Sequence, residues 1–250
     1  MPDAAPEVSV VTITYNEAEN IEEFIEAVAS VLRGRGRSFE IVVVDDDSPD
    51  GTAELVACAA KRIPGVRLVR RKGERGIGSA YLRGIQESVG KIVVTMDADF
   101  SHPPDRLPAL LTEAEGGALA LGSRFLRPGD FVTRWIRWLP TRSINEWHRR
   151  FLGTGIRDHT NGYLAVVREN LQRLLDEGDR IGVRPFDRIL YGLVLSVLAH
   201  RLGIPVFEVS ARYIFRTRGE TKIQLVRGML LLVEEWTDSL RLFPFRASPR

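Results

Sequence analysis

Short apolar runs rich in valine and isoleucine alternate with longer amphipathic stretches through the first half of the chain. The runs are almost continuously apolar, which predicts strands that are covered on both faces. In the amphipathic stretches the apolar residues recur at helical spacing. The pattern predicts strands at residues 8–14, 40–44, 66–69, 92–96 and 118–122, separated by helices at 19–32, 52–62, 77–89 and 104–113. This alternation indicates a parallel sheet with right-handed crossovers.

The second half of the chain departs from this alternation after residue 122. Residues 125–157 are predicted to form a basic loop and a helix. Beyond them the pattern predicts a strand at 162–167, helices at 169–175 and 185–202, a strand at 206–215 and an amphipathic helix at 222–240. No internal repeat or linker divides the sequence. We therefore predict a single α/β domain over residues 1–222, with an open, mostly parallel sheet flanked by helices, and a C-terminal amphipathic helix and tail over 223–250.

Acidic residues stand directly after two of the predicted strands. Asp97 and Asp99 follow the strand at 92–96, and the sequence Asp-Asp-Asp-Ser-Pro-Asp at 45–50 follows the strand at 40–44. Because parallel strands end at one edge of a sheet, these carboxylates are expected to share a ligand crevice. Such carboxylates suit Mg²⁺ or Mn²⁺, which also binds substrate phosphates. The alternative for part of the cluster is local, since acidic residues also cap helices.

Charge and composition restrict the class of protein. The net charge is only +2, yet residues 124–157 hold eight arginines against Asp130 and Glu146, interleaved with tryptophan and phenylalanine. That stretch suits a nucleic-acid surface, an anionic membrane surface or a solvated helix with an aromatic core face. No apolar run approaches the roughly 20 residues of a spanning helix, and residues 1–7 lack a signal-peptide pattern. The lone Cys58 excludes an internal disulfide, favours a reducing compartment and is expected in the core.

Several segments, taken in chain order, form a specific set. They are residues 10–17, 45–52, 76–81, 97–103, 122–125, 157–163 and 216–222. The set resembles family 2 glycosyltransferases of the GT-A fold, with Asp97-Ala98-Asp99 in the place of the family's metal motif. Within that family it is most similar to the branch of dolichyl-phosphate mannosyltransferases and bacterial polyprenyl-phosphate glycosyltransferases. The resemblance extends over nearly the whole chain.

The resemblance assigns residues to the donor side of a transferase site. Three of them would contact the base and ribose of a nucleotide diphosphate sugar: Tyr15, Glu17 and Asp45. Asp97 and Asp99 would hold Mg²⁺ or Mn²⁺ on the diphosphate, with Ser101 at a further ligand position. Asp97 would thereby also bind the donor, and Asp99 would also act in catalysis. The donor stays open between GDP-mannose and UDP-glucose, because Ile13 stands where mannosyltransferases commonly have proline.

The same resemblance places an anionic acceptor beside the donor. Arg124 and Arg216 would act in catalysis by countering the charge of the phosphates, while Arg137, Thr141 and Lys222 would bind the acceptor phosphate. A phosphate acceptor is already anionic near neutral pH. The site therefore needs charge stabilisation and alignment, and no strong general base. Guanidinium groups meet this need through their paired donors.

The resemblance implies an inverting, metal-dependent transferase that moves a hexose onto a polyprenyl or dolichyl phosphate, with mannose from GDP-mannose as the best match. Because that acceptor lies in a bilayer, we expect a peripheral protein in the cytoplasm, at the cytoplasmic face of a membrane. An integral-membrane protein is a possible partner, and no nucleic-acid partner is expected. One alternative is a transferase acting on a glycan hydroxyl, with Asp158 or Asp187 as base. Another is a non-enzymatic nucleotide- or nucleic-acid-binding protein on the same scaffold.

Overall fold

The computed structural model describes residues 5–127, 130–132, 135–187 and 190–214. The first half contains the predicted alternation, in the order β1 (Val8–Thr14), α1 (Ile21–Gly34), β2 (Phe39–Asp45), α2 (Thr52–Arg62), β3 (Val66–Arg70), α3 (Ile77–Glu87), β4 (Ile92–Thr95), a 3₁₀ turn η1 (Pro104–Arg106), α4 (Leu107–Glu115) and β5 (Leu119–Ser123). The second half contains β6 (Phe131–Val132), α5 (Trp135–Leu152), β7 (Leu164–Val167), α6 (Arg168–Ile181), a 3₁₀ turn η2 (Pro185–Asp187), α7 (Tyr191–Arg201), β8 (Val206–Ser210) and β9 (Tyr213–Ile214). The helix predicted at 222–240 lies outside the described residues.

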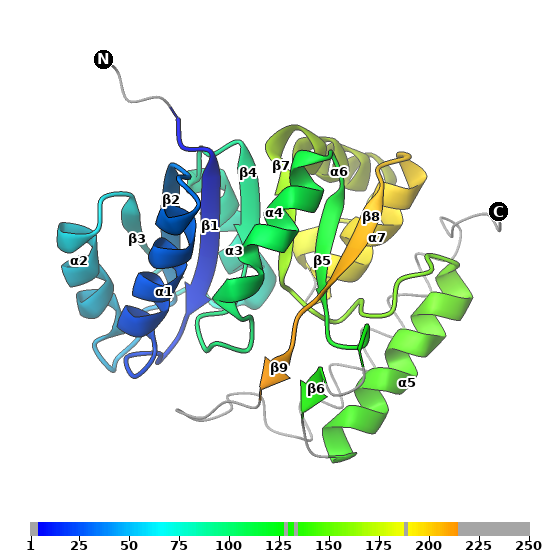
Figure 1. Ribbon diagram of the computed structural model, residues 1–250, viewed down its shortest axis with the longest axis horizontal. Helices are drawn as coiled ribbons and strands as arrows, with labels where there is room; N and C mark the ends of the chain where they lie inside the picture. Colours follow the sequence, from blue (N-terminus) through cyan, green and yellow to red (C-terminus); the bar gives the residue numbers. More distant parts are fainter. Residues whose placement is uncertain (1–4, 128–129, 133–134, 188–189, 215–250) are drawn as a thin grey trace.

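The main sheet has seven strands in the order β3-β2-β1-β4-β7-β5-β8, as Figure 1 shows. β1 runs parallel to β2 and β4, β2 to β3, and β5 to β8. β7 runs antiparallel to both β4 and β5. The open, mostly parallel α/β sheet is therefore confirmed, and β7 is an exception that the apolar pattern did not indicate. A second, two-stranded sheet pairs β6 with β9.

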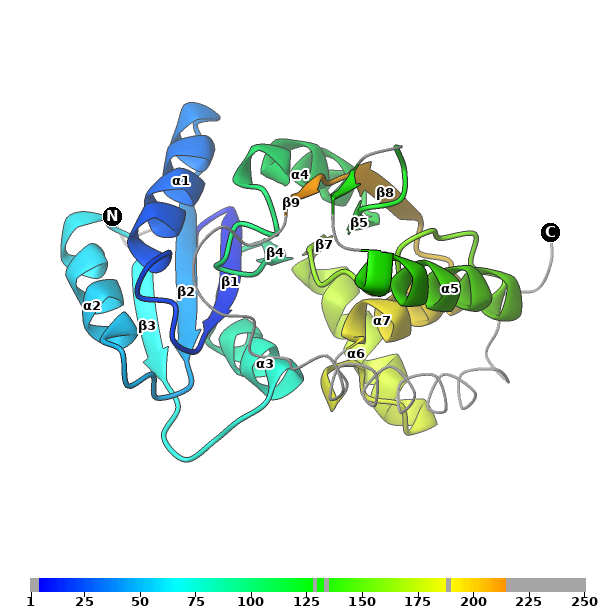
Figure 2. The same cartoon turned by 90° about the horizontal axis from the view of Figure 1, so that it is seen from below.

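Both faces of the main sheet are buried. Helices α1, α2 and α4 cover one face, and α3, α6 and α7 cover the other, as the view in Figure 2 shows. Successive strand residues point to opposite faces. Val10 and Val43 therefore belong to the first core, whereas Val11, Val42 and Val44 belong to the second. This double coverage explains why the strands are almost continuously apolar in sequence.

Helix α3 approaches the sheet closely because it carries glycine at position 84. A Cβ atom at Gly84 would lie 2.3 Å from Cγ1 of Val11 and 2.9 Å from Cγ2 of Val44. Such separations are too short for carbon atoms, so only glycine fits without a shift of the helix. The close approach places α3, including the buried Tyr81 one turn before Gly84, directly behind β1 and β2.

Three expectations from the sequence need correction. The strand predicted at 206–215 is divided, because the chain leaves the main sheet after β8, and β9 then pairs with β6. The helix predicted at 185–202 begins as the turn η2, and α7 starts only at Tyr191. Cys58 is exposed on α2 and does not lie in the core.

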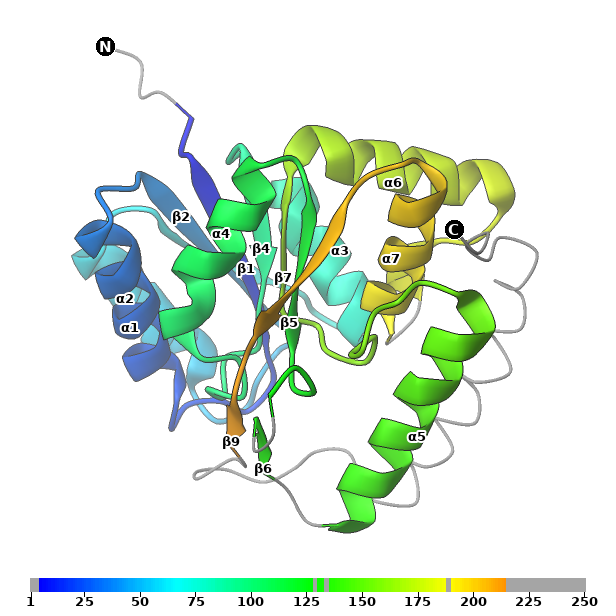
Figure 3. The ribbon, with the colours of Figure 1, turned by 45° about the vertical axis from the view of Figure 1, so that its right-hand side comes forward.

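Helix α5 stands apart from the helices that cover the sheet. Figure 3 shows it at the end of the molecule where β6 and β9 lie. It contains Pro140, and it carries two of the large apolar side chains that are exposed, Trp138 and Leu139. Among the described helices, none combines the length and the apolar character that crossing a bilayer requires.

Candidate functional site

The carboxyl ends of β1, β2 and β4 meet at one edge of the main sheet. The strand register places Thr14 of β1 beside Asp45 of β2, and Val11 of β1 beside Thr95 of β4. The chain order of the strands reverses at β1, between β2 and β4. In open α/β sheets, ligands bind outside the strand ends at such a reversal.

The loops after these same three strands have constrained backbones. Asn16, Asp47 and Phe100 adopt φ values of 56°, 55° and 62°, and they are the non-glycine residues with positive φ in the described part of the chain. Left-handed backbone at residues other than glycine costs on the order of 1 kcal/mol or more and persists where the surroundings enforce it. All three follow β1, β2 or β4, so the strain is concentrated at the edge that the strand order indicates.

Two residues predicted to contact the nucleotide hold the loops together from inside. The Asp45 carboxylate is fully buried and accepts hydrogen bonds from Oγ1 of Thr14 at 2.9 Å and from the backbone N–H of Ser48 at 2.9 Å. Glu17 is 6% exposed and accepts a hydrogen bond from Nδ2 of Asn20 at 3.0 Å. The Asp45 side chain thus joins β1 to the loop after β2, and the Glu17 side chain stabilises its own loop. Their contact with a nucleotide stays a prediction.

A buried arginine that sequence reasoning missed joins the second loop to α3. Arg71 is 2% exposed and pairs with Asp46 through two bonds, Nε to Oδ1 at 2.7 Å and Nη2 to Oδ2 at 2.8 Å. It also donates to the Gly76 carbonyl at 3.1 Å and to Oγ of Ser79 at 3.0 Å. The acidic cluster at 45–50 was a sequence signal for a basic partner, although nothing in the sequence identified which arginine.

Tyr15, the third residue predicted on the nucleotide side, is half-buried in the loop after β1. The guanidinium carbon of Arg75 lies 4.0 Å from the centroid of its ring, which is a cation–π contact. Arg75 follows Arg71 in the loop between β3 and α3. That loop therefore contacts both the first and the second strand-end loops.

Asp97 is held from two directions directly after β4. The hydroxyl of Tyr81 on α3 donates to Oδ1 of Asp97 at 2.6 Å, and the backbone N–H of Asp97 donates to Nδ1 of His102 at 2.8 Å. Burial, together with the nearby charge of Asp97, raises the pKa of Tyr81 well above its usual value, so the hydroxyl stays protonated. The Asp97 side chain nevertheless remains 44% exposed. The carboxylate of Asp97 is thus held in one position and is still accessible to a ligand.

The carboxylates of Asp97 and Asp99 fit a divalent cation whose remaining ligands come from a substrate. Oδ1 of Asp99 accepts a hydrogen bond from the backbone N–H of Ser101 at 3.0 Å, which fixes the short loop. Within the described residues, no three histidine, cysteine or acidic side chains form a metal-binding group by themselves. Mg²⁺ commonly binds one or two carboxylates together with substrate phosphates, which agrees with this pair. Ser101 is 7% exposed, and its role as a further ligand stays a prediction.

Arg124 lies in a buried ion pair at the end of β5. Its Nε and Nη2 donate to the two carboxylate oxygens of Asp158 at 2.7 and 2.8 Å, and Nη2 also donates to Oγ1 of Thr160 at 2.5 Å. Burial raises the pKa of Asp158, but the charge and hydrogen bonds of Arg124 outweigh it and leave the pKa below its usual value. Asp158 is therefore a weak, inaccessible base. The contact of Arg124 with phosphates stays a prediction.

Helix α5 is anchored to this ion pair by Asn145. Its Nδ2 donates to Oγ1 of Thr160 at 3.0 Å, and its Oδ1 accepts the backbone N–H of His159 at 2.6 Å. Thr141 is half-buried one turn earlier on the same helix. The side chain of Arg137 and the whole of Arg216 and Lys222 lie outside the described part of the structure, so these acceptor-side residues stay predictions.

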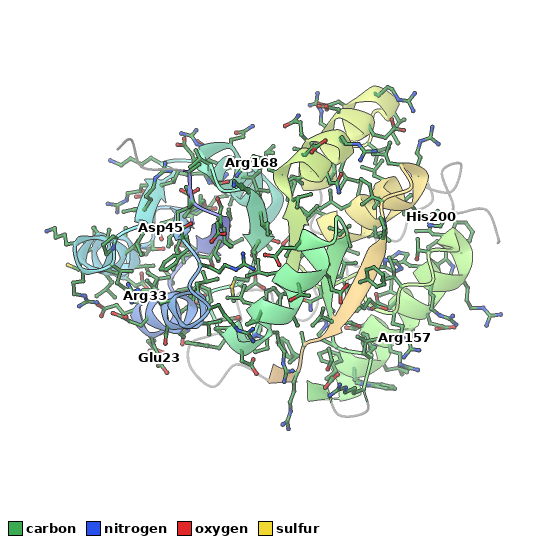
Figure 4. The ribbon with its side chains drawn as sticks, turned by 45° about the horizontal axis from the view of Figure 1, so that its top comes forward. Glu23, Arg33, Asp45, Arg157, Arg168 and His200 are labelled. Atoms are coloured by element: carbon green, nitrogen blue, oxygen red, sulfur yellow. The ribbon has the colours of Figure 1, made fainter. Side chains whose placement is uncertain are left out.

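Among the described residues, those predicted for the donor and those predicted for the acceptor side, Arg124 and Thr141, belong to two halves of the molecule. In Figure 4, Asp45 lies in the half that carries α1 and α2, and Arg157, beside the Arg124–Asp158 pair in sequence, lies in the half that carries α5. Asp97 follows β4, which pairs with β7, so it stands where the two halves of the sheet join. The strand order brings the acidic loops together with Arg71 and Arg75, whereas Arg124 follows β5 and comes from beyond the join.

Comparison with known proteins identifies the class. Residues 9–175 match the family model described as glycosyl transferase family 2. The chain belongs to this family, which confirms the resemblance seen in its motifs.

Individual members of the family are similar to this chain over most of its length. Polyprenol monophosphomannose synthase of Mycolicibacterium smegmatis is 35% identical over 237 residues, which cover 91% of this chain and 85% of that protein. Dolichol-phosphate mannosyltransferase of Pyrococcus furiosus is 32% identical over 232 residues, 87% of this chain but only 59% of that protein. A mannosyltransferase from Pyrobaculum calidifontis, solved in complex with GDP-mannose and Mn²⁺, is similar in fold, with a TM-score of 0.62 at 24% identity over 96% of this chain and 66% of that one.

Proposed function

We propose that this protein transfers a hexose from a nucleotide diphosphate sugar to a polyprenyl or dolichyl phosphate at the cytoplasmic surface of a membrane. GDP-mannose is the proposed donor, since the relatives above are mannosyltransferases. The reaction is proposed to depend on Mg²⁺ or Mn²⁺ and to invert the anomeric carbon. The observation that carries the proposal is the pair Asp97 and Asp99 at the strand-order reversal of a family 2 scaffold, with the Asp97 side chain 44% exposed.

In the proposed reaction these residues act mainly through their charges. Asp97 and Asp99 hold the cation, which when bound stabilises the departing nucleotide diphosphate as a Lewis acid. Asp45, Glu17 and Arg71 keep the loops in one shape, so that the donor meets a preformed crevice and little ordering is left for the bound state. The phosphate acceptor brings its own negative charge and needs no general base. This suits a site in which Asp158 is locked by an arginine.

Transfer to a sugar hydroxyl is less well supported by the geometry. That reaction needs an accessible carboxylate base. Asp158 is completely buried against Arg124, and its pKa is lowered. Asp187 is exposed in η2, so it stays a candidate base that the experiment below tests through the nature of the product.

Helix α5 supplies a surface suited to a membrane acceptor. Trp138 and Leu139 are 38% and 53% exposed, and the Arg142 guanidinium lies 5.6 Å from the Trp138 ring centroid. Exposed apolar side chains next to arginine are typical of proteins that bind the headgroup layer of anionic membranes. We propose that this part of α5 contacts the membrane from which the lipid phosphate is taken. Flotation with anionic liposomes tests this step, and a Trp138→Ser/Leu139→Ser double variant should float less than the parent protein.

Transfer of radiolabelled sugar into organic-extractable lipid is the decisive experiment. Purified protein is incubated with polyprenyl phosphate, Mn²⁺ and either GDP-mannose or UDP-glucose, with Asp99→Ala as the matched inactive variant. The proposal expects metal-dependent lipid label from GDP-mannose that is lost in the variant. Label from UDP-glucose instead would change the donor and keep the acceptor. Donor hydrolysis without labelled lipid would contradict lipid transfer by this protein alone, and would favour a hydroxyl acceptor or a required membrane partner.

A further inference from the structure

Tyr81 is a buried tyrosine whose hydroxyl emerges at the candidate metal site. Its ring is 1% exposed in the core between α3 and the sheet, and its hydroxyl donates to Oδ1 of Asp97 at 2.6 Å. The ring centroid of Tyr191 lies 5.2 Å away, and Tyr191 in turn stacks on Phe186 at 5.0 Å. Because close packing leaves a buried ring few alternative rotamers, the hydroxyl has a fixed position.

His102 confines the same carboxylate from the other side. The backbone N–H of Asp97 can only donate, so Nδ1 of His102 is the acceptor in their bond and the neutral ring carries its proton on Nε2. That nitrogen lies 3.7 Å from Oδ2 of Asp97, a distance at which the N–H dipole attracts the carboxylate without a full hydrogen bond. The His102 ring is stacked on Tyr163 at a centroid distance of 5.0 Å. The two oxygens of Asp97 therefore face different, separately fixed donors.

This arrangement leaves room for a cation. Each carboxylate oxygen has two lone pairs, and the Tyr81 hydroxyl uses one of those on Oδ1. The Asp97 side chain is still 44% exposed. A carboxylate held in this way loses little rotamer freedom when it binds a metal, and groups that orient metal ligands typically contribute about 10- to 100-fold to metal affinity.

We propose that Tyr81 is a positioning residue for the divalent cation, which it serves by holding the Asp97 carboxylate in the orientation that binds the metal. This inference rests on the proposed function, because it takes Asp97 and Asp99 as the metal ligands. Tyr81 belongs to α3, whose close packing depends on Gly84. The metal site is thus supported from the helix behind the sheet as well as from its own loop.

The test is Mn²⁺ binding, measured from the electron paramagnetic resonance signal of free Mn²⁺ in the presence of GDP. Tyr81→Phe removes one oxygen and keeps the ring, and we expect the dissociation constant for Mn²⁺ to rise by about 10-fold or more. Tyr163→Phe is the matched control, since it keeps the ring that stacks on His102 and removes only a buried hydroxyl, which donates to the Pro103 carbonyl and not to Asp97. It should bind Mn²⁺ as the parent protein does.

A second measurement guards against partial misfolding of the variant. The midpoint of the Mn²⁺ activation curve for sugar transfer does not depend on the amount of folded enzyme. For Tyr81→Phe it should move to higher Mn²⁺ concentration by the same factor, with a plateau close to that of the parent. An unchanged dissociation constant and midpoint would overturn the role of Tyr81 alone. If the parent protein itself binds no Mn²⁺ with GDP, the proposed metal site fails instead, and Asp97→Asn provides the reference for absent binding.

Discussion

Two buried histidines make the stability of the fold sensitive to mild acid. His148 of α5 is completely buried, and in the described structure neither of its ring nitrogens has a hydrogen-bond partner. His159 is 1% exposed beside it, with a ring centroid distance of 5.8 Å. Burial lowers the pKa of His148 from 6.5 to about 4, and burial and the neighbouring His148 lower the pKa of His159 to about 3. Both rings are neutral in the folded protein at physiological pH.

The sign of the pH dependence follows from proton uptake. Below the unfolded value of 6.5, the unfolded chain binds two protons that the folded protein excludes until the pH reaches the lowered values. The stability is thus fully present above pH 6.5 and is lost as the pH falls toward 4 and 3. Each histidine removes about 1.4 kcal/mol per pH unit, so at pH 5 each has removed about 2 kcal/mol and the pair about 4 kcal/mol. Typical domains are stable by only about 5–15 kcal/mol.

The assay is urea unfolding, followed by tryptophan fluorescence at pH 7 and at pH 5. Carboxylates also titrate in this range, so the contribution of the histidine is taken from the difference between a variant and the parent protein. His148→Leu should reduce the loss of unfolding free energy between the two pH values by about 2 kcal/mol. At pH 7 it should not destabilise, since it removes two buried nitrogens that lack partners. His200→Gln, at the end of α7 and outside this pair, is the control variant. If His148→Leu loses as much stability as the parent protein between pH 7 and pH 5, the reasoning is refuted.

Three further predictions concern the loops, the helix packing and the metal. Arg71→Ala should cost about 3–5 kcal/mol in urea unfolding because it leaves the buried Asp46 carboxylate unpaired, whereas Arg70→Ala, which breaks exposed ion pairs, should cost less than about 1 kcal/mol. Gly84→Ala should lower stability by about 1–3 kcal/mol through overpacking in thermal unfolding, while Gly34→Ala, where a Cβ meets nothing within 4 Å, should not. Chelation with EDTA should abolish sugar transfer, and Mn²⁺ should restore it; transfer that persists in EDTA would contradict the role of Asp97 and Asp99.

Much of the fold could be predicted because its signals are local. Apolar strands that face helices on both sides have a simple pattern, and α2 was predicted with its observed bounds, Thr52–Arg62. The direction of β7 had no such signal. Leu164–Val167 is as apolar as a parallel strand, and only its long-range pairing with β4 and β5 makes it antiparallel. The break between β8 and β9 is likewise set by separate partner strands.

The site shows the same division between local and distant causes. Asp97 and Asp99 could be recognised because a strand end and the spacing of two carboxylates are visible in sequence. The pairs Asp46–Arg71 and Arg124–Asp158 are 25 and 34 residues apart, and the sequence contains many arginines that could take either place. Asp45 and Glu17 were predicted for a nucleotide, but their burial and hydrogen bonds, which also give them a part in the fold, depend on loop geometry that no spacing reveals.

The strand order also bears on how such a protein could change during evolution. The four strands β3, β2, β1 and β4, with the acidic loops of Asp45 and Asp97, come from one uninterrupted stretch of chain, whereas β7, β5 and β8 come from the stretch after it. A single recombination event between β4 and β5 would therefore exchange the whole acidic half. The two recombined halves would have to remain compatible at the short antiparallel pairing of β4 with β7 and in the packing of α3 and α4 beside it. If the halves bind donor and acceptor as we propose, one crossover would change the donor preference of a descendant and leave its acceptor side ancestral.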